Sequence, residues 1–529
     1  MCVHGQGANE LIAKRVSRFL RQTRTRLGLA LAIAILPAAP VHADWLKASS
    51  DHFVIYAKDD AEDLKTLSRK LESFHAAMEL VTAGERAPPS PSNRVTIFVV
   101  GSERAVRRLH GGNNRYVGGF YAPRAGNPIA VVPSVRRSNG GRTDTHLVTL
   151  LHEYAHHFSS ERNTFPVPRW ISEGSAEFFS SAKFERDGTL SIGMPAHHRK
   201  YELGAVDSVG VEALLDQDYN QRRYSGSAYN AFYGRSWLLY HYLSLDPEVS
   251  GQLNTYLNLL TAGKSSREAG LEAFGDFGRL DRKLGGYLRK RRLLSLRFTP
   301  DLMPVGPIEV TALSEGEAAI LPVRIESQLG VNEEEAAELV EEAREIAARY
   351  PDDPAVLAAL AETEVDADNY DAAIAAADKA IARDPGRVNA YIQKGKALFA
   401  KAEDADDRAE AYAEAVKPFL ALNRVENDHP IPLVYFYRSF AARGLPATDN
   451  AIAGLEYAAV LAPFDLGLKL EVARMQLADG RPDDARRSLI PVAYNPHGGK
   501  SAELAQAMID KIDSGDLAAL DQEALQGAD

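Results

Sequence analysis

The stretch that decides the fold of the first half of the chain is residues 144–158, with the sequence DTHLVTLLHEYAHHF. Apolar side chains recur in it every three or four residues, which is the spacing of one face of an α-helix. Asp144 stands where a side chain can cap the first turn of that helix. The segment is therefore predicted to form a helix with one buried face.

Two histidines lie four positions apart in this predicted helix. His152 and His156 project from the same face about one turn apart and can direct two imidazole nitrogens to one point. Such a point suits a zinc ion. Glu153 is rotated by roughly 100° from His152, which keeps it off the metal but close to a water molecule held there. We interpret Glu153 as a general base rather than as a ligand.

A catalytic zinc site needs three protein ligands and one open position. The segment 168–179, PRWISEGSAEFF, is apolar and helical in character, and its Gly174 and Ala176 are small enough for two helices to approach closely. Glu173 follows His156 by 17 residues, which allows a turn and an antiparallel return. Glu173 is therefore placed to reach the same point as the two histidines.

These two segments together resemble the gluzincin metallopeptidases, in particular the peptidase MA-like families of bacterial exported proteins. The resemblance covers residues 44–243 and includes the segment 231–243, AFYGRSWLLYHYL, which is similar to a Tyr-x-x-Ser-Trp helix of the same group. It implies an α+β zincin-like domain that hydrolyses peptide bonds, with Zn²⁺ as cofactor and Glu173 as the third ligand. It also implies that Tyr233 stabilises the oxyanion, and Tyr229, one turn earlier, is the rival candidate.

Other polar residues near the motifs are open to two interpretations. Glu177 shares a helical face with Glu173, so it could hydrogen-bond a ligand histidine. An ordinary surface carboxylate is the equally weighted alternative. Four further histidines have no partner that the sequence identifies and are interpreted as structural: His157, His197, His198 and His241.

The second half of the chain is rich in Ala, Glu and Asp, and its prolines recur. Pro351 and Pro385 are 34 residues apart, and Pro430, Pro463 and Pro496 follow one another at 33. Small and large residues recur at matching offsets from these prolines: Leu357, Ala373, Ala377 and Ala380 correspond to Tyr435, Ala451, Leu455 and Ala458. This period resembles tetratricopeptide (TPR) repeats, in which proline closes each pair of helices.

About four helical hairpins are expected from this pattern. Residues 402–427 would be an insertion and residues 320–350 a degenerate first unit. An unrelated Ala-rich helical bundle is the alternative. Either structure would make this region all-α.

The N-terminal segment has the pattern of a secretory signal. Five arginines between residues 15 and 26 precede the apolar run 27–36, and small residues lead up to Ala43. We expect cleavage after Ala43 and export to a bacterial periplasm, with no membrane span in the mature form. An uncleaved membrane anchor is the alternative, although the run has about half of the ~20 residues that a span needs. The only cysteine, Cys2, belongs to this segment, so the mature chain would have no disulfide.

A chain of 529 residues is too long for one hydrophobic core, so several domains are expected. The predicted order is a signal peptide (1–43), a metallopeptidase domain (44–297), a linker rich in proline (298–313) and helical repeats (314–529). In the first domain, residues 52–56, 94–100 and 128–132 are strand candidates because they are rich in β-branched and aromatic residues. A helix is expected over residues 60–80.

The negative net charge of the chain bears on the class of partner that it can bind. The whole chain has a formal net charge of −11, and without residues 1–43 it would carry −16, with no basic stripe interleaved with aromatic residues. Nucleic-acid binding is therefore not expected. We expect an exported zinc peptidase that acts on a peptide or protein substrate and binds a protein partner through its repeats. The alternatives are a catalytically inactive scaffold and a zinc hydrolase with a substrate other than a peptide.

Overall fold

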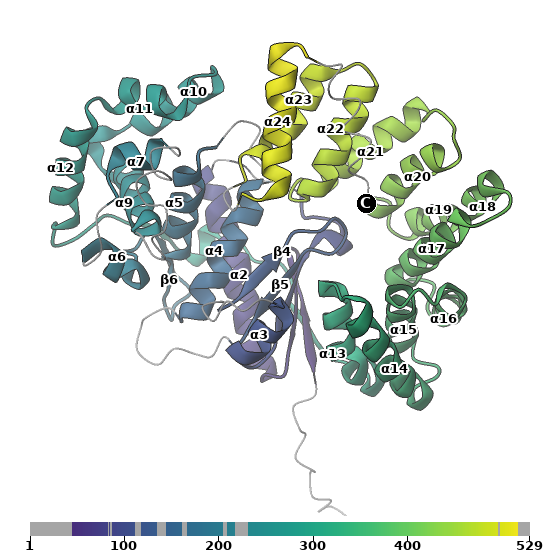
Figure 1. The fold of residues 1–529 in the computed structure, drawn as a ribbon. Coiled ribbons are helices and arrows are strands. Elements are labelled where there is room, and N and C mark those ends of the chain that lie inside the picture. Colours follow the sequence, from purple (N-terminus) through teal and green to yellow (C-terminus); the bar gives the residue numbers. More distant parts are fainter. Residues whose placement is uncertain are drawn as a thin grey trace, which may run out of the picture. The chain divides into compact units, whose positions relative to one another are not determined.

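The computed structural model describes residues 45–82, 84, 87–111, 118–134, 144–160, 167–204, 209–216, 231–495 and 498–516. The predicted signal segment, Cys2 and Tyr229 lie outside these residues. The described residues all belong to one compact unit, Trp45–Asp529. They are mostly helical, with a smaller sheet region in the first half (Figure 1). None of their helices combines the length and the apolar character that crossing a membrane requires.

Six strands of the described chain form the main sheet. They are β1 (Leu46–Ser49), β2 (Phe53–Ala57), β3 (Val95–Val99), β4 (Phe120–Ala122), β5 (Ile129–Val132) and β9 (Glu309–Ala312), in the order β4-β5-β3-β2-β1-β9. The central strands β2, β3 and β5 run parallel, and the outer strands pair antiparallel. The strands predicted at 52–56, 94–100 and 128–132 are confirmed as these three central strands.

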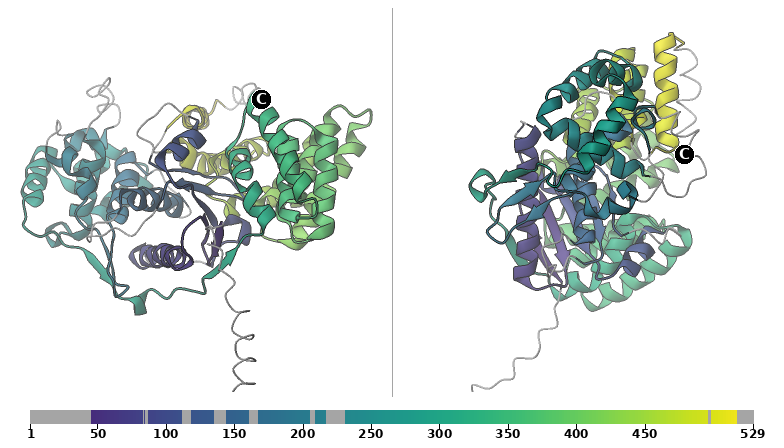
Figure 2. Two further views of the ribbon diagram at one scale, coloured as in Figure 1. Left: turned by 90° about the horizontal axis from the view of Figure 1, so that it is seen from below. Right: turned by 90° about the vertical axis from the view of Figure 1, so that its left-hand side faces the viewer.

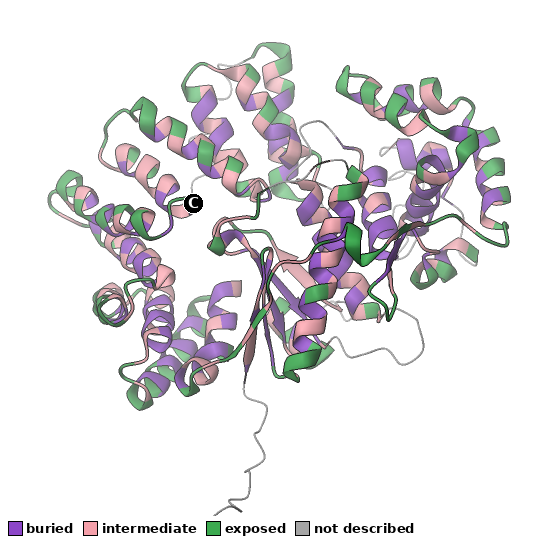
Figure 3. Cartoon of the chain, turned by 180° about the vertical axis from the view of Figure 1, so that it is seen from behind, coloured by how far each residue is buried: buried purple, intermediate pink, exposed green. Residues whose placement is uncertain are grey.

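Helices cover both faces of this sheet (Figures 1 and 2). They are α2 (Ala61–Thr82), α3 (Glu103–His110), α4 (Thr145–Ser160) and α13 (Glu315–Leu329). Ile55 and Ile97 point to one face and pack in one apolar cluster with α2 and α4. Their neighbours Tyr56 and Phe98 point to the other face and pack with α3 and α13, as the two-residue period of a strand requires. Figure 3 shows the buried residues gathered along the sheet and the inward sides of the helices.

The helix α5 (Arg169–Ser180) packs on α4 on one side and on α9 (Phe232–Leu245) on the other. The close approach expected at Gly174 is confirmed. A Cβ atom placed on Gly174 would lie 2.6 Å from the carbonyl oxygen of Ser236 in α9. Because no side chain fits there, Gly174 brings the backbones of α5 and α9 together directly beside Glu173.

The remaining elements of the first half are η1 (Pro91–Asn93), β6 (Lys183–Phe184), β7 (Leu190–Ile192), η2 (His197–Arg199), α6 (Lys200–Gly204), α7 (Val211–Leu215), η3 (Pro247–Val249), α10 (Gln252–Thr261), α11 (Ser266–Phe274), α12 (Phe277–Leu288), β8 (Leu296–Phe298) and η4 (Pro300–Leu302). Several of them pack on α5 or α9, namely α6, α7, α10, α12 and β7. A second, small sheet has the order β6-β7-β8.

The segment 298–313, expected to be a linker, is built into the sheets instead. Phe298 ends β8, and β9 pairs antiparallel with β1 along its whole length. Val310 of β9 is half-buried against the main apolar cluster. The prolines correctly predicted irregular backbone for part of this segment. The pairing of β9 depends on β1, some 260 residues earlier in the chain, and local composition does not reveal such a distant partner. The α+β half therefore extends to about residue 313.

From α13 onward the chain is helical, as predicted. After α13 follow α14 (Glu333–Arg349), α15 (Pro354–Asp366), α16 (Tyr370–Arg383), α17 (Val388–Glu403), α18 (Arg408–Ala415), α19 (Lys417–Val425), α20 (Pro430–Ala442), α21 (Asp449–Leu461), α22 (Leu466–Ala478), α23 (Pro482–Ala493) and α24 (Lys500–Ser514). Consecutive helices pack on each other. The small residues at matching repeat positions are buried: Ala373, Ala377, Ala380, Ala451 and Ala458. The predicted insertion forms α18 and α19.

The helical region also contacts the sheet region. Glu426 accepts hydrogen bonds from the backbone N–H and the hydroxyl of Ser92, at 2.9 and 2.8 Å. The turn between β4 and β5 donates from the N–H of Ala125 to the Asp465 carboxylate, at 2.8 Å. Phe464, between α21 and α22, places its ring 4.7 Å from that of His157 in α4. The two halves of the chain are therefore in direct contact at the helix that carries the His-Glu motif.

Candidate metal centre

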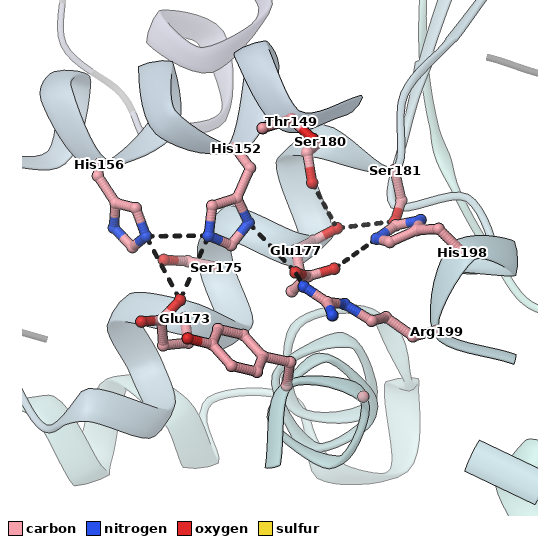
Figure 4. A network of polar contacts seen from close by, with 12 residues as sticks. Thr149, His152, His156, Glu173, Ser175, Glu177, Ser180, Ser181, His198 and Arg199 are labelled. Atoms are coloured by element: carbon pink, nitrogen blue, oxygen red, sulfur yellow. Dashed lines mark hydrogen bonds and ion pairs between the residues drawn. The ribbon is translucent and has the colours of Figure 1, made fainter. Parts of the chain in front are cut away.

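The helix α4 forms as the sequence predicts and presents its motif residues from a buried face. The Asp144 carboxylate accepts a hydrogen bond from the N–H of His146, at 2.9 Å, so it closes the first turn. Leu151, Ala155 and Phe158 are buried against the sheet. His152 and His156 leave the helix toward α5 (Figure 4).

The structure brings together His152, His156 and Glu173 (Figure 4). The two Nε2 atoms lie 3.1 Å apart. One Glu173 oxygen lies 3.3 Å from Nε2 of His152 and 3.4 Å from Nε2 of His156. Glu173 is completely buried, and neither of its oxygens receives a hydrogen bond within the described part of the chain. A buried carboxylate of this kind needs a cationic neighbour, which either a protonated histidine or a metal ion between the three side chains can supply.

The donor set fits a zinc ion. Two imidazole nitrogens and one carboxylate oxygen are the ligands of zinc sites that keep a fourth position open. With zinc–ligand distances of about 2.0–2.1 Å and tetrahedral angles, donor atoms lie about 3.3 Å apart. The three distances here, 3.1, 3.3 and 3.4 Å, lie on either side of that value.

The other ring nitrogen of each histidine also has a partner. Nδ1 of His152 lies 3.2 Å from an oxygen of Glu177, and Nδ1 of His156 lies 3.3 Å from the hydroxyl of Ser172. Contacts of this kind fix the ring orientation of metal-binding histidines and the nitrogen that faces the ion. Of the two interpretations of Glu177, the structure therefore favours the one in which it supports a histidine.

Glu177 joins a network that the sequence did not reveal (Figure 4). Its carboxylate lies 2.5 Å from Nε2 of His198 and 2.5 Å from Nη2 of Arg199. Arg199 also contacts Glu202 at 2.9 Å, and the second oxygen of Glu202 accepts a hydrogen bond from the N–H of Gly234 at 2.7 Å. His198 was interpreted as having no identifiable partner, and Arg199 was not singled out. Both come from η2, some 20 residues downstream, so no helical spacing pointed to them.

Burial and charge shift the pKa values of this cluster. Burial alone would lower the pKa of His152, but its contacts with Glu173 and Glu177 outweigh burial and raise its pKa to about 10. Burial would raise the pKa values of Glu173 and Glu177, but the histidines hold both below their ordinary range. His152 therefore carries a proton between two carboxylates at neutral pH. A metal ion that binds there must displace that proton.

The two candidate catalytic residues lie beside this cluster. Glu153 is half-buried and has neither a hydrogen bond nor an ion pair within the described residues. The ring of Tyr233 lies 6.4 Å from that of His152. Burial and the charge of Glu173 raise the pKa of Tyr233, so its hydroxyl keeps its proton at neutral pH. Its rival, Tyr229, falls outside the described residues.

His157 and His241 have partners away from the cluster. His157 lies 2.5 Å from the Tyr121 hydroxyl, and burial lowers its pKa to about 3. His241 lies 2.8 Å from the Tyr287 hydroxyl and 2.9 Å from the carbonyl of Gly193. Both therefore have hydrogen-bond partners outside the metal cluster, and their structural role stays a prediction.

No protein-family model matches this chain, and the comparison with curated proteins found no match. Solved structures similar to parts of it include TTC0263, a thermophilic TPR protein of Thermus thermophilus, with 19% identity over 37% of this chain and 98% of that one and a TM-score of 0.32. MamA of Desulfovibrio magneticus has 16% identity over 34% and 93%, with a TM-score of 0.25. Yeast Tom70 has 14% identity over 88% and 78%, with a TM-score of 0.27.

The first of these neighbours is described as a TPR protein. None of the three neighbours named above is described as a peptidase. All three TM-scores lie below 0.5, so these likenesses carry no argument about function.

Proposed function

We propose that this protein is a zinc-dependent peptidase of the gluzincin kind. The proposal is supported by one observation above all, the convergence of His152, His156 and Glu173 on one point with donor atoms 3.1, 3.3 and 3.4 Å apart. In this proposal the three side chains hold the ion and the α+β half is a zincin-like catalytic domain. Glu177 and Ser172 keep the two rings in position from behind.

When bound there, zinc supplies Lewis acidity, which lowers the pKa of water from about 15.7 toward ~7 and polarises a carbonyl group. Glu153 follows His152 directly and its carboxylate is not engaged by other described residues, so it is available to accept a proton from the attacking water. It then donates that proton to the leaving amine. Tyr233 donates a hydrogen bond to the developing oxyanion, and Tyr229 is the alternative donor.

In this proposal the helical region binds a protein partner or presents a protein substrate. Stacked helical hairpins form extended surfaces that suit peptide segments. Phe464 of this region contacts His157 of α4. A partner bound to the helical region would therefore be attached to a part of the protein that packs directly on the helix with the proposed zinc ligands. We further propose export to a bacterial periplasm with cleavage after Ala43, or retention of the N-terminal segment as an anchor.

A second candidate function is a protein-interaction scaffold without catalysis. The observation that favours it is the extent of the helical region, which takes up α13 to α24. In that case the His152 cluster would hold a proton or a structural ion. A zinc hydrolase acting on a substrate other than a peptide is a third and weaker candidate.

Metal content and peptide cleavage by the purified protein separate these functions. We expect one zinc per chain by elemental analysis, cleavage of casein or of a peptide library, and loss of both in His152→Ala. Glu153→Gln should retain the zinc and lose turnover, because only the proton transfer is removed. Zinc without cleavage in the unmodified chain would support the scaffold, and a chain that binds no zinc would rule out the peptidase.

A further inference from the structure

Tyr233 contacts two arginines that sequence reasoning did not single out. The guanidinium of Arg199 stands over its ring, 4.7 Å from the centroid. The guanidinium of Arg169, at the first residue of α5, lies 5.8 Å from the same centroid, and its Nη2 donates to the Tyr233 hydroxyl oxygen over 3.5 Å. A cation within about 6 Å of an aromatic ring face is attracted to it. Two positive groups therefore contact this phenol, one at its ring and one also at its hydroxyl oxygen.

Arg199 is itself fixed from two directions. Glu177, which supports His152, lies 2.5 Å from one guanidinium nitrogen, and Glu202 lies 2.9 Å from the other. Both carboxylates are almost completely buried. A guanidinium held by two buried carboxylates has little rotational freedom, because its planar fork must satisfy both.

The same network also reaches the backbone next to Tyr233. Glu202 accepts a hydrogen bond from the N–H of Gly234, the residue after Tyr233, at 2.7 Å. Gly234 lacks a side chain, and a Cβ atom there would lie 3.0 Å from Cβ of Glu202. The chain of contacts thus runs from the ring of His152 through Glu177, Arg199 and Glu202 to the first turn of α9, which carries Tyr233.

Arg169 is not neutralised in the same way. It stands one helical turn before Glu173 on α5, yet its guanidinium packs over the Phe232 ring at 4.6 Å and has no ion pair with a described carboxylate. Because its N–H group donates to the Tyr233 oxygen, that side of the oxygen acts as an acceptor. The hydroxyl proton of Tyr233 must then point elsewhere.

We propose that Arg199 is a positioning residue, which holds the ring of Tyr233 so that its hydroxyl proton is directed at the substrate carbonyl oxygen, with Arg169 holding the hydroxyl oxygen. The proposal rests on the proposed peptidase function, in which Tyr233 is the oxyanion donor. Arg199 touches neither the substrate nor the ion. Its effect is transmitted through the position of the ring and the first turn of α9.

The test uses Arg199→Lys in the zinc-loaded full chain. Lysine keeps the positive charge between Glu177 and Glu202, so the buried carboxylates stay compensated, but it has no planar face to stack on the ring. We expect kcat to fall about 10-fold, with KM and zinc affinity changed less than about 3-fold. Tyr233→Phe should lower kcat by about 100-fold. Adding Arg199→Lys to Tyr233→Phe should cause no further loss, because the hydroxyl that Arg199 positions is gone.

A matched control is Arg235→Met on the same helix. Arg235 is mostly buried and pairs with Asp281 at 2.7 Å, so its loss disturbs α9 while both guanidinium groups beside Tyr233 stay in place. Its effect on kcat should be the same with Tyr233 and with Phe at that position. Additive losses for Arg199→Lys and Tyr233→Phe would overturn the proposal, as would a loss confined to zinc affinity.

A second double-mutant cycle, measured on stability, does not depend on catalysis. In the zinc-free protein, Arg199→Met and Tyr233→Leu should be coupled by about two- to five-fold in the unfolding equilibrium constant, the strength of one cation–π contact. If the unmodified chain cleaves nothing, the peptidase proposal fails while this coupling still tests the contact. A zinc-free coupling indistinguishable from zero would overturn the positioning role on its own.

Discussion

The replacement Gly174→Ala tests how the close packing of α5 on α9 positions the candidate ligand next to it. The added Cβ would lie 2.6 Å from the carbonyl oxygen and 2.9 Å from the carbonyl carbon of Ser236, whereas ordinary contacts begin at 3.4 Å. The obstacle is the backbone of α9, which cannot rotate away as a side chain can. The helices must therefore separate by roughly 0.8 Å at this point, the difference between the contact of 2.6 Å and the ordinary limit of 3.4 Å. Glu173, the adjacent residue, would move with α5.

Two free-energy effects oppose each other in this variant. Alanine is favoured over glycine inside a helix by about 1 kcal/mol. Overpacking in a well-packed core costs about 1–3 kcal/mol, and an immovable backbone obstacle favours the upper end. We therefore expect a net loss of about 1–2 kcal/mol in the free energy of unfolding, together with weaker zinc binding.

Tryptophan fluorescence during urea unfolding is a suitable assay. All three tryptophans lie in the α+β half, and Trp170 and Trp237 are buried in α5 and α9 themselves. Gly286→Ala in α12 is the control, because no atom lies within 4 Å of its added Cβ, and we expect it to stabilise the protein by up to about 1 kcal/mol. If Gly174→Ala proved as stable as the unmodified chain, the account of α5 packing would be wrong.

Three further predictions concern the surroundings of the site. Glu177→Gln removes the charge behind His152 and should weaken zinc binding about 10- to 100-fold, measured by competition with a chromophoric chelator; unchanged affinity would refute this role. His429 is buried, and burial lowers its pKa to about 4 from 6.5, so the stability that its neutral form contributes is complete above pH 6.5 and is lost as the pH falls toward 4; His429→Asn, which keeps a helix cap, should not show this loss in urea titrations. Phe464→Ala should cost about 3 kcal/mol in the free energy of unfolding, followed by circular dichroism, and a cost near zero would mean that this ring does not join the two halves.

Local patterns predicted those parts of the fold that depend on neighbours in the sequence. The helical spacing of Leu147 to Phe158 and the β-branched run at residues 95–99 produced α4 and β3. The segment 309–312 was not predicted as a strand, because it is short and its pairing partner β1 lies at the other end of the α+β half. The role of α13 was missed for the same reason. It was assigned to the repeats, but Leu321 and Ile325 also cover one face of the sheet.

The candidate site divides in the same way. The four-residue spacing predicted that His152 and His156 share one face of a helix, and that Glu173 and Glu177 do the same. Both predictions concern residues within a single helix. The spacing left open whether Glu177 faced the histidine or solvent. That depended on His198 and Arg199, which reach it from η2. Sequence periodicity carries no information on such contacts between elements.

The pairing of β9 with β1 has a practical consequence for separating the two halves of the protein. A shortened chain that ended at residue 297 would retain β1 but lose the strand that covers its outer side. The N–H and C=O groups of β1 would then be unpaired at the edge of the sheet. An unpaired edge strand of this kind can pair with a strand of another chain. Such a fragment should self-associate, whereas one that ends after Leu313 keeps the edge of β1 paired. The useful point of division thus lies after Leu329, because a fragment that keeps α13 also keeps Leu321 and Ile325 over one face of the sheet.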